Sequence, residues 1–156
     1  MQKIVTCLGF NGQAEEAINL YTSTIPNSKI LSITRTGEAG PGPKGSVLAA
    51  TFVLDGQEFT GINGGPEFKF TEAMSLIVNC DTQEEVDHYW SRLSAGGEEV
   101  QCGWLKDRFG VAWQITPVVL TEMLKDKDPA RAKRVMAAML KMKKIDIAEL
   151  KKAYAG

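Results

Sequence analysis

Gln114 is the residue of this sequence that first raises a question of chemistry. It lies in KDRFGVAWQI, residues 106–115, where a predicted turn leads into a strand and a single amide side chain stands among apolar neighbours. An amide can hold a ligand by hydrogen bonds, but it carries no charge with which to hold a metal cation. The question is therefore what Gln114 binds, and which elements bring other polar groups to it.

Cys102 is a second residue whose type could do chemistry. It lies in QCGWLKD, with Lys106 and Arg108 nearby in the sequence but no histidine. A nucleophilic cysteine needs a base or a positive field that forms its thiolate. Without a neighbouring histidine, packing or an idle thiol is the favoured interpretation.

The three cysteines, Cys7, Cys80 and Cys102, are far apart and form no CxxC pair. This usage fits reduced thiols in a cytoplasm better than a disulfide framework. Residues 1–10 lack the shape of a signal peptide and predict a first strand. Because Cys7 and Cys80 lie on predicted strands, we expect them to be buried and Cys102 to be the most accessible of the three.

Composition and charge limit the classes of protein to which this chain can belong. The 156 residues are 44% hydrophobic and 24% charged, which is typical of a globular domain. No segment approaches the roughly 20 apolar residues that a membrane-spanning helix needs. Residues 125–156 carry ten basic and four acidic side chains, with Tyr154 as their only aromatic residue. A solvated helix face is therefore favoured over a nucleic-acid surface, and we expect neither nucleic acid nor a membrane as a partner.

The first 116 residues repeat a pattern of strand, helix and three strands. EEAINLY at 15–21 aligns with EEVDHYW at 84–90, a spacing of 69 residues that places Thr6 on Ser75. Asp55-Gly56 predicts a hairpin within the first copy. One copy has too small a sheet to bury its own helix, so we expect the two copies to share one curved sheet.

The predicted fold class is α+β, with two βαβββ modules at about 1–66 and 67–116. Residues 117–156 are expected to add helices to the same domain, because Thr116-Pro117 and Asp128-Pro129 are typical helix starts and Asp146 begins a third helical segment. Two apolar stripes follow, made of Val135, Met136, Met139 and Leu140, and of Ile147, Leu150 and Tyr154. Since the sheet should leave little surface for these stripes, they predict a homodimer.

The doubled βαβββ unit resembles the vicinal oxygen chelate superfamily, which includes glyoxalases, extradiol dioxygenases and fosfomycin and bleomycin resistance proteins. A more specific resemblance is to its PhnB-like branch, often labelled 3-demethylubiquinone 3-methyltransferase domains. It is carried by FNGQAEEAINLY, GGPEFKFTEAMSLIVNC, TQEEVDHYW, GGEEVQCGWLKDRFGVAWQITP and RVMAAMLKMKKIDIAELKKAY, and so covers nearly the whole chain. The resemblance implies a cup-shaped pair of modules, with a pocket inside the curved sheet and the module helices outside it.

The resemblance also implies a set of inward positions. In metal-dependent members, His, Gln or Glu on the first and last strands of each module bind a divalent cation. Here those positions are Thr6, Asn63, Ser75 and Gln114, with Gln114 standing where the family pattern Asp-Pro-x-Gly-x-x-x-Glu has its glutamate. Two hydroxyls and two neutral amides supply no charge to offset the desolvation of a cation, and His88 is expected on an outer helix. We therefore expect no metal and no cofactor.

Phe68, Cys102, Trp104 and Trp113 are further candidates to line the cup, although aromatic residues at strand spacing are more often core. Four small polar groups at the floor of an apolar cup suit a neutral or carbonyl-bearing ligand. Equally, these groups could satisfy one another or bind ordered water. The sequence leaves these two possibilities open.

Three functions remain open at this stage. The favoured one is a small-molecule binding module that works without metal. The second is an enzyme on a quinone-like or other planar carbonyl substrate, with Thr6, Ser75 and Gln114 polarising an oxygen. The third is a structural or regulatory dimer whose cup is filled by side chains. No glycine-rich turn of the kind that binds S-adenosylmethionine joins a strand to a helix, so the residues do not support the methyltransferase label.

Overall fold

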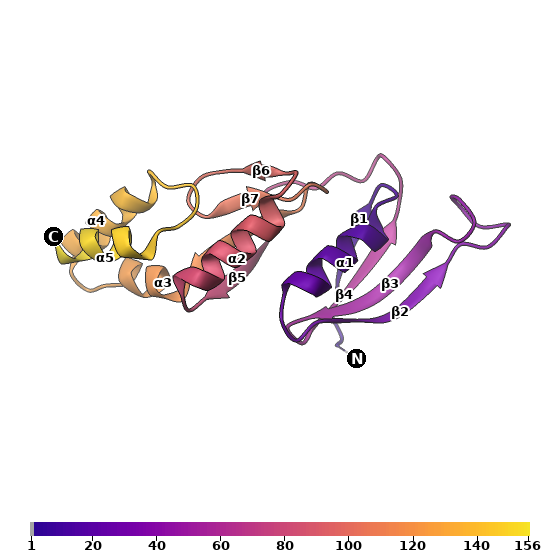
Figure 1. Cartoon of the computed structure of the whole chain (residues 1–156), viewed down its shortest axis with the longest axis horizontal. Helices are drawn as coiled ribbons and strands as arrows, with labels where there is room; N and C mark the ends of the chain where they lie inside the picture. The colour runs from indigo at the N-terminus through magenta and orange to yellow at the C-terminus, as the bar shows by residue number, and fades with distance from the viewer. Residues whose placement is uncertain (1) are drawn as a thin grey trace. The chain divides into compact units, whose positions relative to one another are not determined.

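The computed structural model describes residues 2–156 and divides the chain into two compact units, with the boundary between Lys69 and Phe70. Each unit contains one four-stranded sheet and one helix packed on it, and the second unit also contains the C-terminal helices (Figure 1). The predicted α+β class, with two βαβββ modules and C-terminal helices, is confirmed. The expected single sheet shared by both modules is not found among residues 2–156, where the strands form two four-stranded sheets. The strands of each sheet are hydrogen-bonded to strands of the same unit.

The first unit consists of β1 (Thr6–Phe10), α1 (Ala14–Thr24), β2 (Lys29–Arg35), β3 (Val47–Leu54) and β4 (Gln57–Asn63). The strand order is β1-β4-β3-β2, with β1 parallel to β4 and the other pairs antiparallel. The helix buries one face, made of Ala14, Ala17, Ile18 and Tyr21, as its 3.6-residue period predicts. Gly61 makes room for this packing, because a Cβ there would stand 2.8 Å from Ile18 Cδ1.

The hairpin between β3 and β4 confirms the Asp55-Gly56 prediction. Asp55 and Gly56 have φ angles of 48° and 81°, so both central residues are left-handed, as a type I′ turn requires. Aspartate and glycine are among the residues that adopt this region at low cost.

The second unit repeats the arrangement with β5 (Ser75–Cys80), α2 (Gln83–Ser94), β6 (Glu98–Glu99), β7 (Trp104–Lys106) and β8 (Ala112–Pro117). Its strand order is β5-β8-β7-β6, and β5 is parallel to β8. The buried face of α2 is Val86, Tyr89, Trp90 and Leu93. Thr82 caps this helix, because its side chain accepts a hydrogen bond from Glu85 N at 3.2 Å.

The C-terminal helices are α3 (Val118–Leu124), α4 (Pro129–Met139) and α5 (Ile147–Ala155). Asp128 and Asp146 cap α4 and α5, which confirms the helix starts predicted at these two residues. At the third predicted start, α3 begins directly after Pro117 and has no side-chain cap. No helix among residues 2–156 combines the length and the apolar character that crossing a bilayer requires.

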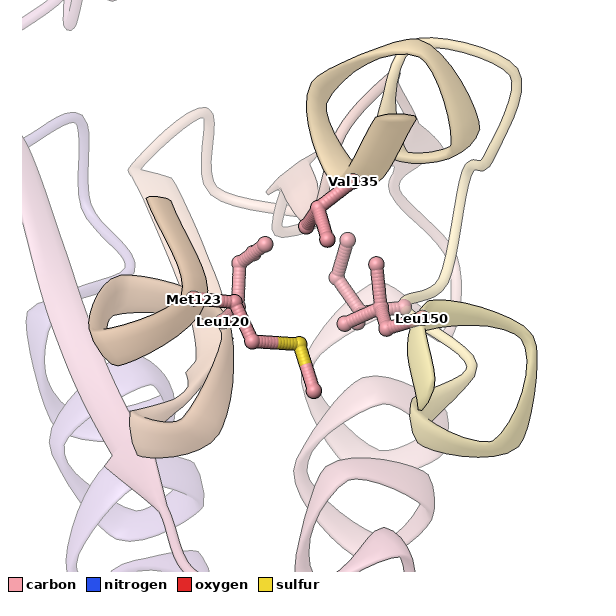
Figure 2. Close-up of a cluster of buried hydrophobic side chains, with 5 residues drawn as sticks. Leu120, Met123, Val135 and Leu150 are labelled. Carbon is pink, nitrogen blue, oxygen red and sulfur yellow. The ribbon is translucent and has the colours of Figure 1, made fainter. Parts of the chain in front are cut away.

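The three C-terminal helices share a core of their own (Figure 2), made of Leu120, Met123, Val135, Ile145 and Leu150. Met139, Met142 and Tyr154 pack against it. The premise that these apolar stripes lack an intramolecular partner was therefore wrong for part of each stripe, because Val135 and Leu150 are buried among the other helices and Met139, Ile147 and Tyr154 are partly buried. Met136 and Leu140 remain 40% and 60% exposed.

Candidate functional site

The second sheet has a face buried beneath α2 and an open face. Leu105, Trp113 and Ile115 are almost fully buried, and they alternate with residues that point the other way. The strand pairing places the following residues together on the opposite side, which we call the open face of the second sheet: Ser75, Ile77, Asn79, Glu98, Trp104, Lys106, Ala112, Gln114 and Thr116. Ile77 is 58% exposed, so this face is accessible.

Gln114 and Ser75 meet on the open face. Gln114 Nε2 donates a hydrogen bond to Ser75 Oγ at 2.9 Å, and both groups are partly buried. Because the serine oxygen accepts this bond, its hydroxyl hydrogen can be directed elsewhere, and Gln114 keeps its carbonyl oxygen Oε1 as an acceptor. The pair therefore presents one donor and one acceptor side by side, without charge.

Apolar side chains flank this polar pair. Gln114 is directly opposite Ile77 on the parallel strand and directly opposite Trp104 on the antiparallel strand. Neighbours directly opposite on one face have Cβ atoms roughly 5 Å apart, so the amide lies between an aliphatic and an aromatic group. Convergent polar groups within an apolar surround are the usual composition of a small-molecule site.

The one cation of this face is paired. Lys106 Nζ forms an ion pair with Glu72, a contact that raises the pKa of Lys106 and lowers that of Glu72. Both side chains are substantially exposed, so the pair is hydrated and marks the rim of the face rather than its centre.

Trp113 does not lie on the open face, contrary to the prediction that it lines the cup. It is 2% exposed, and its Nε1 donates to Asp107 Oδ2 at 2.9 Å. The Asp107 carboxylate also accepts from Phe109 N and Val111 N, at 2.9 and 3.0 Å. This supports the structural interpretation of the turn, because a buried carboxylate with several donors fixes the path of the chain into β8.

Cys102 lies in the turn before β7, where its backbone N donates to Met142 O at 2.8 Å. Its side chain is partly exposed. The order of accessibility predicted for the thiols is wrong, because Cys7 is exposed, whereas Cys80 is buried as expected. Burial raises the pKa of the Cys80 thiol to about 12, with smaller contributions from the Glu85 and Asp81 charges.

Thr6 lies on the opposite face of its sheet from the one predicted. It alternates in step with Leu8 and Phe10, which are buried beneath α1, and it pairs with Phe59. The face away from α1 carries the side chain of Cys7, the neighbour of Thr6. Since side chains alternate with a period of two, a slip of one residue moves a side chain to the other face.

The misassignment of Thr6 by one residue comes from the spacing between the two copies of the repeat. The helices begin at Ala14 and Gln83, a spacing of 69, but the buried last residues of the first strands are Phe10 and Cys80, a spacing of 70. The strand-to-helix connection is one residue longer in the first module. A spacing taken from the helices therefore misassigns the strands. In the sequence, Leu8 and Phe10 alternate with Cys7 and Gly9, and this apolar alternation is the signal that could have placed Thr6 on the buried face.

The Asn63 side chain caps α1 and does not lie on the face of the first sheet away from that helix. Its Oδ1 accepts a hydrogen bond from Ala14 N at 2.9 Å, and its Nδ2 donates to Val47 O at 2.8 Å. The N-cap residue Gln13 makes no side-chain cap of its own, so the amide of a distant strand caps the helix. Asn63 pairs with Phe10 at the far end of β1 from Thr6, and those two predicted site residues are not brought together.

Phe68 lies on the face of the first sheet that is turned away from α1, which we call the open face of the first sheet. A Cβ added to Gly9 would meet its ring at 2.4 Å, and one added to Gly64 at 2.0 Å. Gly9 alternates with the buried Leu8 and Phe10, which places the ring on the side away from α1. Phe68 remains 44% exposed although two glycine backbones support it.

The donor chemistry of both open faces does not fit a divalent cation. No group of three or more His, Cys, Asp or Glu side chains converges anywhere in residues 2–156. The polar groups on the face of the first sheet away from α1 include the Cys7 thiol, the Glu58 carboxylate and hydroxyls such as those of Ser32 and Thr51, whose oxygens are 2.6 Å apart. One carboxylate among neutral hydroxyl and amide groups does not offset the desolvation of a divalent ion.

Comparison with known proteins identifies relatives. Residues 2–116 match the family model described as 3-demethylubiquinone-9 3-methyltransferase. A PhnB protein from Bacillus cereus, named after the same methyltransferase, is 46% identical with a TM-score of 0.72, over 75% of this chain and 100% of that one. No curated protein matches this chain.

Two more distant structures are similar in fold alone. PA1353 from Pseudomonas aeruginosa is 23% identical with a TM-score of 0.63, over 75% of this chain and 98% of that one. The fosfomycin resistance protein FosX from Listeria monocytogenes is 16% identical with a TM-score of 0.52, over 78% and 97%. FosX has also been solved with Mn(II) and sulfate.

Proposed function

Because the chain belongs to the 3-demethylubiquinone-9 3-methyltransferase family of PhnB-like proteins, within the vicinal oxygen chelate superfamily, we propose that it binds a small organic molecule without a metal ion. The binding surface is the open face of the second sheet. The observation that carries the proposal is the hydrogen bond of Gln114 to Ser75, set between the exposed Ile77 and the partly exposed Trp104.

The geometry favours a neutral ligand with a carbonyl or hydroxyl group. The Gln114 N–H polarises the Ser75 hydroxyl, which makes it a better donor to a ligand oxygen, and Gln114 Oε1 accepts from a ligand O–H or N–H. No unpaired cation of this face attracts an anion, since Lys106 is held by Glu72. A flat or aliphatic body would lie on the indole of Trp104 and on Ile77.

Native mass spectrometry of the protein as purified from cells is the test. We expect a bound organic species in the wild type and its loss in Gln114→Leu, which removes both polar functions of the amide. Ser91→Ala is the matched control, because this exposed hydroxyl on α2 bonds only its own helix at His88 O in the described contacts. A wild type that carries no such species, and is not stabilised by a panel of neutral carbonyl compounds, contradicts the proposal.

Catalysis on a carbonyl substrate is the second candidate, and the same Ser75–Gln114 pair supports it, because a polarised hydroxyl can stabilise charge that develops on a carbonyl oxygen. Ser75→Ala separates the two functions. Turnover that disappears while binding persists indicates an enzyme, whereas no turnover by the wild type on a substrate panel leaves a binding protein.

We also propose that the chain is a cytoplasmic homodimer. Met136 and Leu140 on α4 support pairing, because they remain exposed after the C-terminal core has formed. Three free cysteines support a reducing compartment. Sedimentation equilibrium tests the oligomer, and a single-chain mass across micromolar concentrations, unchanged by Leu140→Lys, would end this part of the proposal.

A further inference from the structure

The turn that leads into β7 has a constrained backbone. Cys102 has a φ of 60° and Gly103 a φ of 85°, so a residue with a side chain adopts the left-handed region beside a glycine. Trp104 N donates to Gln101 O at 3.0 Å and closes the turn. A non-glycine residue keeps such a conformation where its surroundings impose it.

The segment between α4 and α5 supplies those surroundings. Cys102 N donates to Met142 O and Gly103 N donates to Lys143 O, each at 2.8 Å. On its other side the turn is bonded to β8, because Ile115 N donates to Gly103 O at 2.8 Å. The turn is therefore held between the strand that carries Gln114 and a segment of the C-terminal extension.

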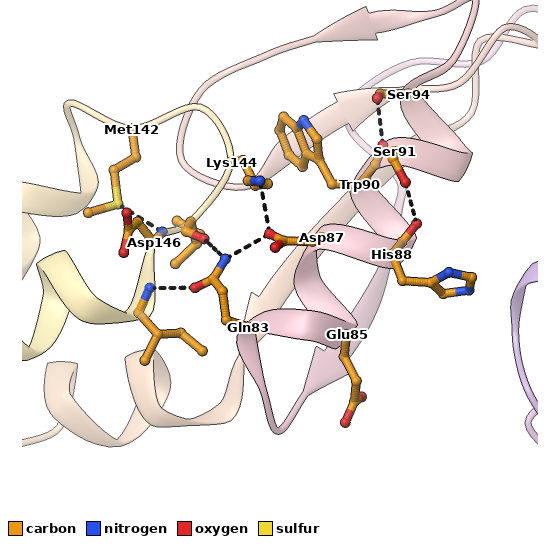
Figure 3. A network of polar contacts seen from close by, with 12 residues as sticks. Gln83, Glu85, Asp87, His88, Trp90, Ser91, Ser94, Met142, Lys144 and Asp146 are labelled. Atoms are coloured by element: carbon orange, nitrogen blue, oxygen red, sulfur yellow. Dashed lines mark hydrogen bonds and ion pairs between the residues drawn. The ribbon is translucent and has the colours of Figure 1, made fainter.

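A single side chain at the start of α2 holds that segment in place (Figure 3). Gln83 Nε2 donates to Ile145 O at 3.0 Å, and Gln83 Oε1 accepts from Ile147 N at 2.8 Å. The same Nε2 donates to Asp87 Oδ1 at 3.0 Å, and Asp87 pairs with Lys144 Nζ at 2.8 Å. The Gln83 amide therefore hydrogen-bonds, through both its nitrogen and its oxygen, to backbone groups 62 and 64 residues away.

We propose that Gln83 is a positioning residue for the open face of the second sheet: it fixes segment 142–147, which fixes the Cys102–Gly103 turn and thereby the indole of Trp104 beside Gln114. This inference rests on the proposed function of that face. The family model ends at residue 116, so the acceptors of the turn lie beyond the family-matched part of the chain. The C-terminal helices accordingly act as a brace for the ligand-binding face.

Acrylamide quenching of Trp104 fluorescence measures this positioning without a ligand. The other two tryptophans are 4% and 2% exposed, so Trp104 dominates the quenching, and Trp104→Phe in each background assigns its share. Gln83→Met keeps the length of the side chain and removes its hydrogen bonds. Asp128→Ala is the matched control, because it removes the cap of α4 and so loosens the C-terminal helices, while the side-chain partners of Asp128 in the described contacts, Ala130 N and Arg131, lie outside segment 142–147.

The expected result is a rise of about twofold in the quenching constant of Trp104 in Gln83→Met, and no rise in Asp128→Ala, because only the first variant frees the turn. An unchanged constant in Gln83→Met overturns the inference. An equal rise in both variants also overturns it, because general loosening of the helices then explains the change.

Amide exchange in the wild type is a second measurement, which holds even if Gln83→Met does not fold. The Cys102, Gly103 and Ile147 amides should exchange at rates within about threefold of one another after correction for sequence, because one opening event releases all three. Cys102 and Gly103 exchanging like an unprotected turn, while Ile147 stays protected, contradicts the brace. Neither measurement involves a ligand, so each leaves the binding test at Gln114 to decide the proposed function separately.

Discussion

Asn63→Ala separates a structural role from a ligand-binding role at a residue that the sequence assigns to the site. In the structure the Asn63 amide bridges two elements, accepting from Ala14 N at 2.9 Å and donating to Val47 O at 2.8 Å. Alanine removes both bonds. It also leaves the first turn of α1 without a side-chain cap, since Gln13 provides none.

The size of the effect follows from those two bonds. Loss of a helix cap costs about 1 kcal/mol, and loss of a second partly buried hydrogen bond costs about 1 kcal/mol more. We therefore expect Asn63→Ala to lower the free energy of unfolding by about 2 kcal/mol, measured by urea denaturation. If the first unit, which ends at Lys69, unfolds as one cooperative unit, this loss corresponds to a melting temperature lower by roughly 10 °C.

Asn63→Asp is the matched control for this prediction. A carboxylate keeps the acceptor for Ala14 N and suits the positive end of the helix dipole, but it cannot donate to Val47 O. Its loss of stability should be about half that of alanine. A loss below about 0.5 kcal/mol in Asn63→Ala, or equal losses in both variants, would refute the capping role.

Three further predictions concern thiols, pH and metal. In native protein a thiol reagent followed by peptide mapping should modify Cys7 first, Cys102 second and Cys80 last, because Cys80 is buried with a pKa raised to about 12; early modification of Cys80 contradicts this. The Lys144 ammonium and then the Gln83 amide hold the pKa of Asp87 below its usual range, so Asp87 contributes stability above its ordinary value near pH 4 and loses it as the pH falls through the lowered value. The stability gap between wild type and Asp87→Asn should therefore close in acid, and a gap independent of pH is the contrary result. Elemental analysis after exhaustive dialysis should find no stoichiometric divalent metal, and one equivalent of zinc or manganese per chain refutes that expectation.

Local signals in the sequence predicted the elements well. Asp55-Gly56, Asp128-Pro129 and Asp146 mark the hairpin and two helix starts that the structure contains. Each of these signals acts within about four residues, because a turn angle or a cap depends on adjacent backbone groups. The helix faces followed from their period for the same reason.

Hydrogen bonds between residues far apart in the sequence could not be predicted from such local signals. Asn63 caps a helix that begins 49 residues earlier, and Gln83 binds backbone groups more than 60 residues later. Neither partner is recognisable from the sequence, because any amide side chain can bond any backbone group that the fold brings near. Ser75 and Gln114 were placed together by the resemblance, which carries information on the strand register that residue patterns lack.

Correcting the register of the first strand strengthens the argument about metal. With the strand spacing of 70, Cys7 corresponds to Ile77, and their cross-strand partners Thr60 and Gln114 correspond to each other. These four residues occupy equivalent places on the faces of the two sheets that lie away from α1 and α2. An isoleucine cannot ligate any ion, and a lone thiol with one hydroxyl and one amide provides too little charge for a divalent cation. Ile77 also forms an apolar wall beside Gln114, and such a setting favours an organic molecule over a metal ion.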